Sequence, residues 1–187
     1  MSDQKNPLRG LSLWVPEKDS QANALKQYLA WLKSHGARTR FSHAHPMTTL
    51  HLDLNVLDNL LMAIGEGSFE GSYFEKENFI KSRLESLELR VLSSWYKDPR
   101  RKTQDLSCQE ILVASVSCAL LIESDAAFID LTSSEIDPLC QIHLQQVLLK
   151  YAQTRHVTVL LNEKGQWQEV FQDELKLTPQ GLERFTA

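Results

Sequence analysis

Short apolar runs separated by polar turns predict strands and helices that alternate along the chain. The run LSLWV at 11–15 predicts a buried strand, and the polar residues 16–20 predict a turn. In 21–34, apolar side chains recur at helical spacing, and Gly36 gives a plausible end to that helix. We therefore expect a strand, a turn and an amphipathic helix, followed by a second strand over 37–41.

The next part of the chain has a helical pattern. Asn55 is a favourable N-cap, and Asp58 gives the following helix an acidic first turn. A second apolar stripe predicts a helix over 74–95, and a polar, basic connection follows it. These elements predict a helical subdomain at about 55–105.

A buried helix and a central strand come next. Ser107 can cap a helix whose body, 111–122, is apolar nearly all round, so we expect that helix to be buried. The short apolar run 126–129 ends at Asp130, which is typical of a central parallel strand.

The last third predicts two more strands and two helices. Pro138 suits the first turn of a helix that reaches about Ala152. The alternating residues 156–161 predict a strand, 167–171 a short final strand, and the residues from about Pro179 a short C-terminal helix.

Strand and helix alternation favours an α/β layered domain with a helical insertion, in one domain spanning 1–187. Asp130 then lies at the carboxyl end of its strand, and open α/β sheets hold ligands at that edge.

Composition narrows the classes of function. Hydrophobic residues make up 42% of the chain, which favours a folded core, and the formal net charge of −4 disfavours general nucleic-acid binding. The basic cluster Lys97, Arg100, Arg101 and Lys102 is either a solvated loop or a contact for an anionic partner.

No membrane-spanning segment is predicted. The longest nearly apolar run has 12 residues and includes serines, and the N-terminus has no apolar signal core. Cys108, Cys118 and Cys140 have no metal-like spacing and fit reduced thiols. We expect a soluble, cytoplasmic chain that reaches a membrane only through a partner.

Three segments carry a resemblance to a known family. LSCQE at 106–110, AAFID at 126–130 and SSEID at 133–137 have the layout of a signature helix, a Walker B strand and a D-loop. Upstream, DLNVLDNLLMA at 53–63 is similar to the helix entry after a Q-loop. The chain therefore resembles the nucleotide-binding domain of ABC transporters over roughly residues 11–172. The resemblance implies a P-loop NTPase fold, here with a reduced N-terminal sheet.

The same alignment shows substitutions where the family does its chemistry. PEKDSQAN at 16–23 replaces the glycine-rich P-loop, and Gln21 stands at the position of its lysine. Leu131 replaces the carboxylate that follows the Walker B aspartate, and leucine cannot accept a proton. The Q-loop glutamine would fall near Pro46 or Met47. We therefore expect neither ATP nor magnesium to bind, and no ATPase activity.

The remaining motif positions agree with that expectation. The switch histidine should follow the strand at 156–161, but Asn162 stands there, and His156 lies at the other end of the strand. Ser107 is retained in a signature that has lost both glycines. Asp130 is either a remaining magnesium contact or a carboxylate that caps the strand end. Asp137 is either a turn or cap before Pro138 or an interface residue.

Two other groups of residues are candidates. His43, His45 and His51 share one irregular segment, but their spacing matches no common zinc pattern, so no metal site is predicted. Leu50, Leu52, Tyr73 and Phe74 lie in or near the region that, in the family, receives a short helix of the membrane subunit. They are either anchors of a docking surface or core residues.

The sequence thus predicts a non-catalytic, ABC ATPase-like subunit that binds protein. The partners implied are an ABC-type membrane subunit, an active ATPase homologue, or a second copy. The alternative is an ATP-binding subunit with a rewired site that is active only beside a functional homologue. A small independent enzyme is a third possibility, but no nucleophile–base set supports it.

Overall fold

A single sheet organises the molecule. The computed structural model describes residues 10–16, 23–34, 40–46, 48–65, 71–86, 88, 97–133, 135–163, 165–167, 169–171 and 173–186. The strands of the sheet are β1 (Gly10–Trp14), β2 (Phe41–Ala44), β3 (Ala126–Asp130), β4 (His156–Leu160), β5 (Asp173–Thr178) and β6 (Gly181–Thr186). They lie in the order β2-β3-β4-β1-β5-β6, and only β6 is antiparallel to its neighbour. The carboxyl ends of β1–β4 therefore meet along one edge.

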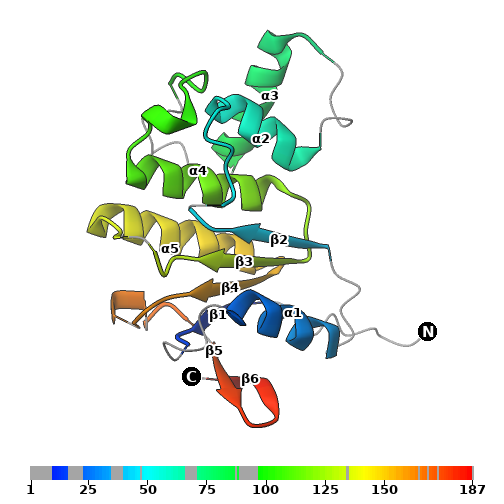
Figure 1. Ribbon diagram of the computed structural model, residues 1–187, viewed down its shortest axis with the longest axis vertical. Helices are drawn as coiled ribbons and strands as arrows, with labels where there is room; N and C mark the ends of the chain where they lie inside the picture. Colours follow the sequence, from blue (N-terminus) through cyan, green and yellow to red (C-terminus); the bar gives the residue numbers. More distant parts are fainter. Residues whose placement is uncertain are drawn as a thin grey trace, which may run out of the picture.

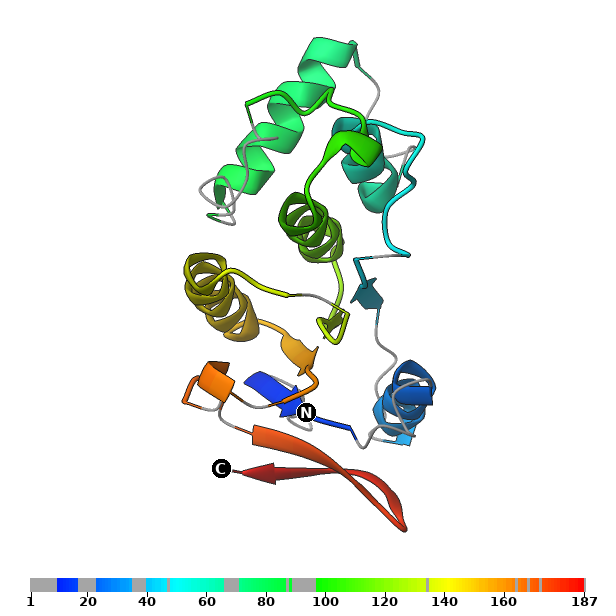
Figure 2. The same ribbon diagram turned by 60° about the vertical axis from the view of Figure 1, so that its left-hand side comes forward.

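Helices cover both faces of this sheet. They are α1 (Ala24–Ser34), α2 (Val56–Ile64), α3 (Tyr73–Ser86), α4 (Cys108–Leu121) and α5 (Pro138–Ala152), with short 3-10 turns at Thr103–Asp105 and Gly165–Trp167. Figure 1 shows α4 above the sheet, with α2 and α3 stacked beyond it. Figure 2 shows α1 and α5 on opposite sides of the strands. The helical block predicted at about 55–105 thus forms a layer of its own above α4.

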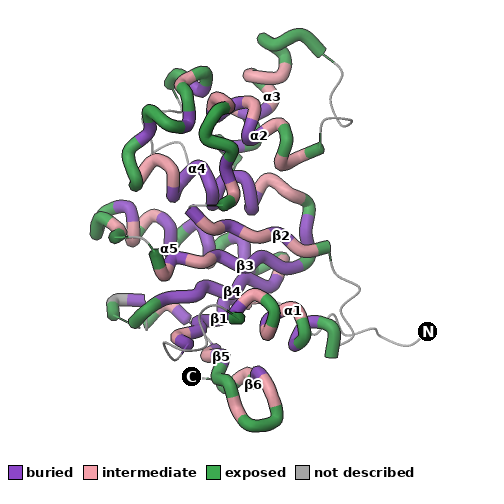
Figure 3. Tube along the Cα trace, viewed as in Figure 1, coloured by how far each residue is buried: buried purple, intermediate pink, exposed green. Residues whose placement is uncertain are grey.

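Alternation along the strands divides the core into two clusters. On β3, Ile129 faces the cluster shared with α4 and α5, whereas Phe128 faces the cluster under α1. On β1, Leu13 and Trp14 are divided in the same way. Successive side chains of a strand point to opposite faces, so each strand supplies both layers. Figure 3 shows the central strands buried along almost their whole length.

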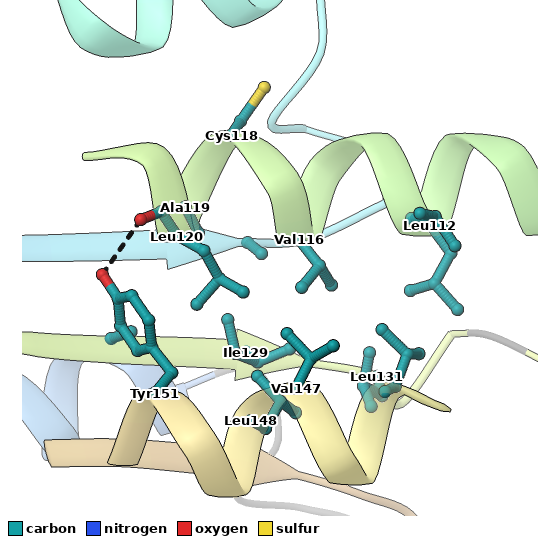
Figure 4. Packing of buried hydrophobic residues seen from close by; sticks show 14 of the residues in the cluster. Leu112, Val116, Cys118, Ala119, Leu120, Ile129, Leu131, Val147, Leu148 and Tyr151 are labelled. Carbon is teal, nitrogen blue, oxygen red and sulfur yellow. Dashed lines mark hydrogen bonds between the residues drawn. The ribbon is translucent and has the colours of Figure 1, made fainter. Parts of the chain in front are cut away.

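The signature helix α4 lies at the centre of the larger cluster. Leu112, Val116 and Leu120 point toward Val147 and Leu148 of α5, while Cys118 points the other way (Figure 4). The thiol of Cys118 donates to the carbonyl oxygen of Asn59 at the start of α2, at 3.8 Å. The helix is therefore packed on several sides, as its all-round apolar sequence predicts.

The C-terminal prediction was wrong. A hairpin of β5 and β6 replaces the expected helix from Pro179, and a 3-10 turn at Gly165–Trp167 lies where a final strand was expected to begin. Leu182 and Phe185 are three residues apart, a spacing that fits a helix. In the structure, Leu182 is buried under α1 because pairing with β5 extends the sheet there.

Two other boundaries moved. The second strand is Phe41–Ala44 rather than 37–41, and residues 37–39 lie outside the described part. The helix expected over 74–95 is described as Tyr73–Ser86, and residues 89–96 are not described. His43 consequently belongs to an edge strand and not to an irregular segment.

Candidate functional site at the carboxyl edge of the sheet

Asp130 ends β3 at the carboxyl edge, and its carboxylate is engaged locally. Its Oδ1 accepts hydrogen bonds from the backbone N–H of Thr132 at 3.0 Å and from the Thr132 hydroxyl at 2.7 Å. The side-chain amide of Asn162, which follows β4, donates to the Thr132 carbonyl oxygen at 2.5 Å. The carboxylate thus closes the turn after β3, which favours the strand-end cap over a magnesium contact.

Leu131 occupies the position where the resemblance implies a catalytic carboxylate. Its side chain is 3% exposed and packs with Ile129 and Val147 in the larger core cluster (Figure 4). Its backbone N–H donates to the Leu160 carbonyl oxygen of β4 at 3.0 Å. This side chain belongs to the core and presents no group that can activate water.

The P-loop equivalent is described only at its ends. Pro16 is buried and Asn23 is exposed, whereas Gln21 lies outside the described residues. The same is true of Met47, one of the two residues at the Q-loop position, and its neighbour Pro46 is buried. Neither proline carries a side-chain donor or acceptor for a metal or a water molecule.

Ser107 begins the signature helix as predicted, and it does so through a capping box. Its hydroxyl accepts from the N–H of Glu110 at 3.3 Å, and Glu110 Oε2 accepts from the N–H of Ser107 at 2.9 Å. Glu110 also accepts from the Arg101 guanidinium at 2.9 Å. Ser107 thus has a structural role at the helix N-terminus.

Asp137 is the N-cap of α5, in agreement with the cap interpretation. Its Oδ1 accepts from the N–H groups of Leu139 at 2.9 Å and Cys140 at 3.3 Å. The backbone N–H of Asp137 donates to Gln109 Oε1 at 3.2 Å, which joins the D-loop equivalent to the signature helix. These bonds hold the two motif segments in one arrangement.

The side chains of His43 on β2 and Phe128 on β3 lie on the same face of the sheet. The two rings are 5.8 Å apart, and the His43 and His45 rings are 6.3 Å apart. Burial lowers the pKa of His43 below its ordinary value, with a smaller contribution from His45, while the nearby Asp130 carboxylate opposes this shift. His51 is exposed in the loop before α2. Among the described residues, no group of three His, Cys, Asp or Glu side chains could hold a metal ion.

The candidate docking residues separate into one core residue and three exposed ones. Leu50 is only 7% exposed and packs in the larger core cluster, so its prediction as a docking residue was wrong. Leu52, Tyr73 and Phe74 are exposed, and Phe74 is 68% exposed. Leu50 is buried through its packing in the larger core cluster, whose members come from distant parts of the chain, and the local sequence does not reveal such packing.

Sequence reasoning missed a cavity that is lined by residues in and around α2 and by Lys76 of α3. Its volume is about 480 Å³, and it is lined by Leu54, Asp58, Leu61, Met62, Ile64, Gly65 and Lys76. Met62 is also exposed on α2. We name the set Leu52, Met62, Tyr73 and Phe74 the α2–α3 surface. The helical spacing of Met62 could have indicated it, but the cavity depends on how α3 packs against α2.

The basic cluster is largely engaged within the protein. The Arg100 guanidinium donates to Glu77 Oε2 from two nitrogens, at 3.2 and 3.0 Å, and lies 4.9 Å from the centre of the Tyr73 ring. Arg101 is bonded to Glu110, and Lys102 donates to the Asp53 carbonyl oxygen. These contacts favour the solvated-loop interpretation over a contact with an anionic partner.

A second cavity lies where three helices end, far from the predicted motifs. It measures about 270 Å³ and is lined by Arg83, Ser86, Leu120, Leu121, Glu123, Val147, Lys150, Tyr151, Thr154 and Arg155. Arg155 donates to the carbonyl oxygens of Ile122 and Ser124, at 2.9 Å each. The arginine thus satisfies carbonyl groups just after α4, which is a structural role.

Comparisons with known proteins agree on the fold. No protein-family model and no curated protein sequence matches the chain. Among solved structures, an ABC transporter in an inward-facing conformation matches with a TM-score of 0.69 at 16% identity, over 95% of this chain and 72% of that one. The chain has the fold of an ABC transporter cassette.

Two further solved structures support this result. An ATP-binding subunit of an ABC transporter matches with a TM-score of 0.68 at 14% identity, over 90% of this chain and 75% of that one. Dimeric MJ0796, a bacterial ABC transporter cassette, matches with a TM-score of 0.65 at 15% identity, over 89% and 80%. Within the described residues, no helix is both long and apolar enough to cross a membrane.

Proposed function

We propose that this chain is a non-catalytic relative of ABC cassettes that works by binding protein. Its role would be structural or regulatory, within a transporter-type assembly at the inner face of the cytoplasmic membrane. The partners would be an ABC-type membrane subunit and an ATPase homologue or a second copy. An ABC cassette fold with an altered site is the basis of this proposal.

The observation that carries the proposal is the position of Leu131. The residue that would position water in an active cassette is here a core leucine, directly after an aspartate whose Oδ1 is engaged by Thr132. Restoring a carboxylate at this position would place an unpaired charge in the core, which is strongly unfavourable. The burial of Leu131 in the core supports the non-catalytic proposal.

The α2–α3 surface supports the binding half of the proposal. Met62 exposes apolar area at the cavity of about 480 Å³, and Phe74 is an exposed aromatic residue on α3. Exposed aromatic side chains are typical anchors of protein interfaces. Tyr73 is held in place, because its hydroxyl accepts from Asn55 at 3.3 Å and Arg100 covers its ring. A fixed aromatic side chain loses little conformational entropy when a partner binds.

Calorimetry with Mg-ATP tests the non-catalytic half. We expect no micromolar binding by the purified chain, because PEKDSQAN offers neither the glycines nor the lysine of a P-loop. An active ABC cassette measured in the same buffer is the positive control. Clear saturable binding of Mg-ATP would contradict the proposal.

Site-specific photo-crosslinking tests the binding half. A photoreactive amino acid at Phe74 should crosslink in native membranes to a transporter membrane subunit, identified by mass spectrometry. The same probe at Phe185, an exposed aromatic residue on β6, is the matched control. Equal crosslinking from both positions, or no transporter component from Phe74, would reject the α2–α3 surface as the docking site.

Retention of Asp130 and Ser107 keeps a second function open. Both remain at their motif positions, and Ser107 still begins a helix at its N-terminus, where anions bind favourably. In this alternative the chain binds nucleotide weakly and works beside an active homologue. An ATPase assay of the pair would then show a sharp fall in rate with Asp130→Asn, whereas the first proposal predicts no change.

A further inference from the structure

The second cavity, of about 270 Å³, lies between the helical block and the core and has no part in the proposed function. Its walls come from the last turns of α3, α4 and α5 and from the residues that follow α4 and α5. Figure 2 shows α3 descending toward α5, so the cavity lies between two layers of the molecule. A ligand bound there would contact the helical block and the core at the same time.

One wall of the cavity is apolar. Leu120 and Val147 are buried, and Tyr151 lies beside them (Figure 4). The Tyr151 hydroxyl donates to the Leu120 carbonyl oxygen at 3.1 Å, which holds the ring in place and satisfies its polar end. Such a wall favours a ligand with an apolar body, because binding removes that body from water.

Arg155 presents a fixed guanidinium to the cavity. Its Nη1 donates to the carbonyl oxygens of Ile122 and Ser124, and its Cζ lies 4.6 Å from the centre of the Tyr151 ring. A guanidinium has five N–H donors, and within the described part of the chain the hydrogen bonds of Arg155 use Nη1 alone. The N–H groups of Nη2 and Nε therefore remain for a carboxylate, which a guanidinium can bind through two parallel hydrogen bonds.

Arg83 and Lys150 add two cations whose present partners can be exchanged. Arg83 lies 3.8 Å from a carboxylate oxygen of Glu123, and Lys150 lies 2.5 Å from one of Glu88. All four side chains are more than half exposed, and ion pairs between exposed side chains are weak. The anionic group of a ligand can therefore take the place of either carboxylate at little cost.

The charges around the cavity favour an anion. Of the described residues that line it, three are cationic and only Glu123 is anionic. The C-terminal ends of the three helices carry partial negative charge, which opposes this excess. Arg155 offsets part of that opposition, because it donates to carbonyl groups just after α4. A small positive excess remains, which selects for an anionic group without giving tight binding by itself.

We infer that this cavity binds a small organic anion that combines an aromatic body with one carboxylate. The ring lies against the apolar wall, and the carboxylate accepts hydrogen bonds from Arg155 and from Arg83 or Lys150. An apolar cavity of about 150 Å³ is large enough for benzene, so the larger volume here admits one ring and its carboxylate. The bound anion ties the end of α3 to the end of α5.

Fluorine NMR of the full chain with para-fluorobenzoate tests this inference. We expect a saturable change in the fluorine signal, with a dissociation constant on the order of 0.1 to 1 mM for a ligand of about ten non-hydrogen atoms. The neutral para-fluorobenzamide has nearly the same shape and should bind about 5-fold more weakly or less, because it lacks the charge. Equal binding of the two compounds would overturn the inference.

Variants of the cationic residues locate the site. The double variant Arg83→Gln/Lys150→Gln should weaken binding of para-fluorobenzoate by about 10-fold or more. Arg155→Lys should weaken it by about 3-fold or more, because lysine keeps the charge but cannot form two parallel hydrogen bonds. Circular dichroism confirms that each variant is folded, and the exposed double variant decides the result if Arg155→Lys unfolds.

A second double variant is the matched control. Arg100→Gln/Lys176→Gln removes an arginine and a lysine that are also more than half exposed and paired with glutamates, but that lie outside the cavity. It should leave the affinity unchanged. The inference is overturned if the wild-type chain shows no saturable binding, if binding survives Arg83→Gln/Lys150→Gln, or if the control variant weakens it equally. None of these results bears on the α2–α3 surface.

Discussion

At the residue scale, Asn59 shows how one polar side chain joins several segments. Its Oδ1 accepts from the N–H of His51 at 2.7 Å, and its Nδ2 lies within 3.1 Å of the carbonyl oxygens of His51 and Asn55. Nδ2 also lies 3.0 Å from the hydroxyl of buried Thr103. The loop before α2, the first turn of α2 and the segment before α4 therefore meet at this amide.

Asn59→Ala should destabilise the protein by about 2 kcal/mol, because it leaves buried polar groups without partners. Urea unfolding followed by circular dichroism measures the change. Asn78→Ala, at an exposed position of α3, is the matched control and should change stability by less than about 0.5 kcal/mol. Similar losses in the two variants would show that the network around Asn59 contributes little.

The three thiols should differ sharply in reactivity. Cys108 is exposed, whereas burial raises the pKa of Cys118 to about 12 and also raises the pKa of Cys140. Because the thiolate is the reactive form, iodoacetamide should modify Cys108 first and Cys118 last. Peptide mass spectrometry follows the order, and denatured protein, in which all three react, is the control. Early modification of Cys118 in folded protein would contradict its burial on α4.

At the residue scale, some site predictions depended only on residues close by in the sequence, and others depended on distant residues. Ser107 and Asp137 act as N-caps, and a cap depends on residues two or three positions away, so the sequence predicts it. Leu50 was misassigned because its burial depends on contacts with distant residues in the larger core cluster. The contact between the His43 and Phe128 rings was missed for the same reason, since the two residues lie on different strands.

At the element scale, α4 combines a capped N-terminus with a buried body. The capping box of Ser107 and Glu110 satisfies N–H groups at its first turn, and Arg101 fixes Glu110 from outside. From Leu112 to Leu120 every residue is buried. The cap and the buried body together tie the helix to the rest of the molecule.

Ser107→Ala should cost about 1 kcal/mol of stability, because it removes the hydroxyl that caps α4. The change is measured as a lower urea midpoint with an unchanged slope. Ser133→Ala, in the exposed turn after β3, is the control and should have little effect. A loss equal to that of Ser133→Ala would mean that Ser107 was retained for another reason, such as contact with a partner.

The elements in the last third of the chain show that periodicity predicts a long element better than a short one. The helix α5 was predicted from Pro138 to about Ala152 and was confirmed, because fifteen residues carry a clear start signal and a long pattern. The hairpin of β5 and β6 was not predicted: the final strand was expected over 167–171, and a helix was expected where β6 lies. Its strands have six residues each, and a pattern that short fits either structure until pairing is known.

At the scale of the whole molecule, the protonation of His43 makes the free energy of unfolding depend on pH. Burial lowers the pKa of His43, and the nearby His45 adds to this, while Asp130 opposes it. The unfolded chain therefore binds a proton more readily than the folded chain once the pH falls below about 6.5. Stability should fall as the pH is lowered from there toward the pKa of His43 in the folded state.

Urea unfolding at about pH 7.5 and about pH 5.5 measures this dependence. His43→Gln should reduce the difference between the two pH values, whereas His51→Gln, in the exposed loop, should leave it unchanged. Equal pH dependence in wild type and His43→Gln would show that His43 is not the group responsible.

The sequence by itself determined the class of fold, and through the family resemblance it predicts that the family's chemical groups are lost. The order of apolar runs and three motif segments predicted an ABC cassette fold, which structural similarity supports, because such patterns repeat over many residues. It also placed leucine after Asp130 and glutamine at the P-loop lysine position, facts that need no folding to read.

Only the tertiary structure decided which of these residues share a surface. It buried Leu50, exposed Phe74 on α3, and set His43 next to Phe128 across two parallel strands. Burial and neighbourhood depend on packing between residues far apart in the chain, and local periodicity carries no information about such pairs. For that reason the α2–α3 surface became visible only in the folded molecule.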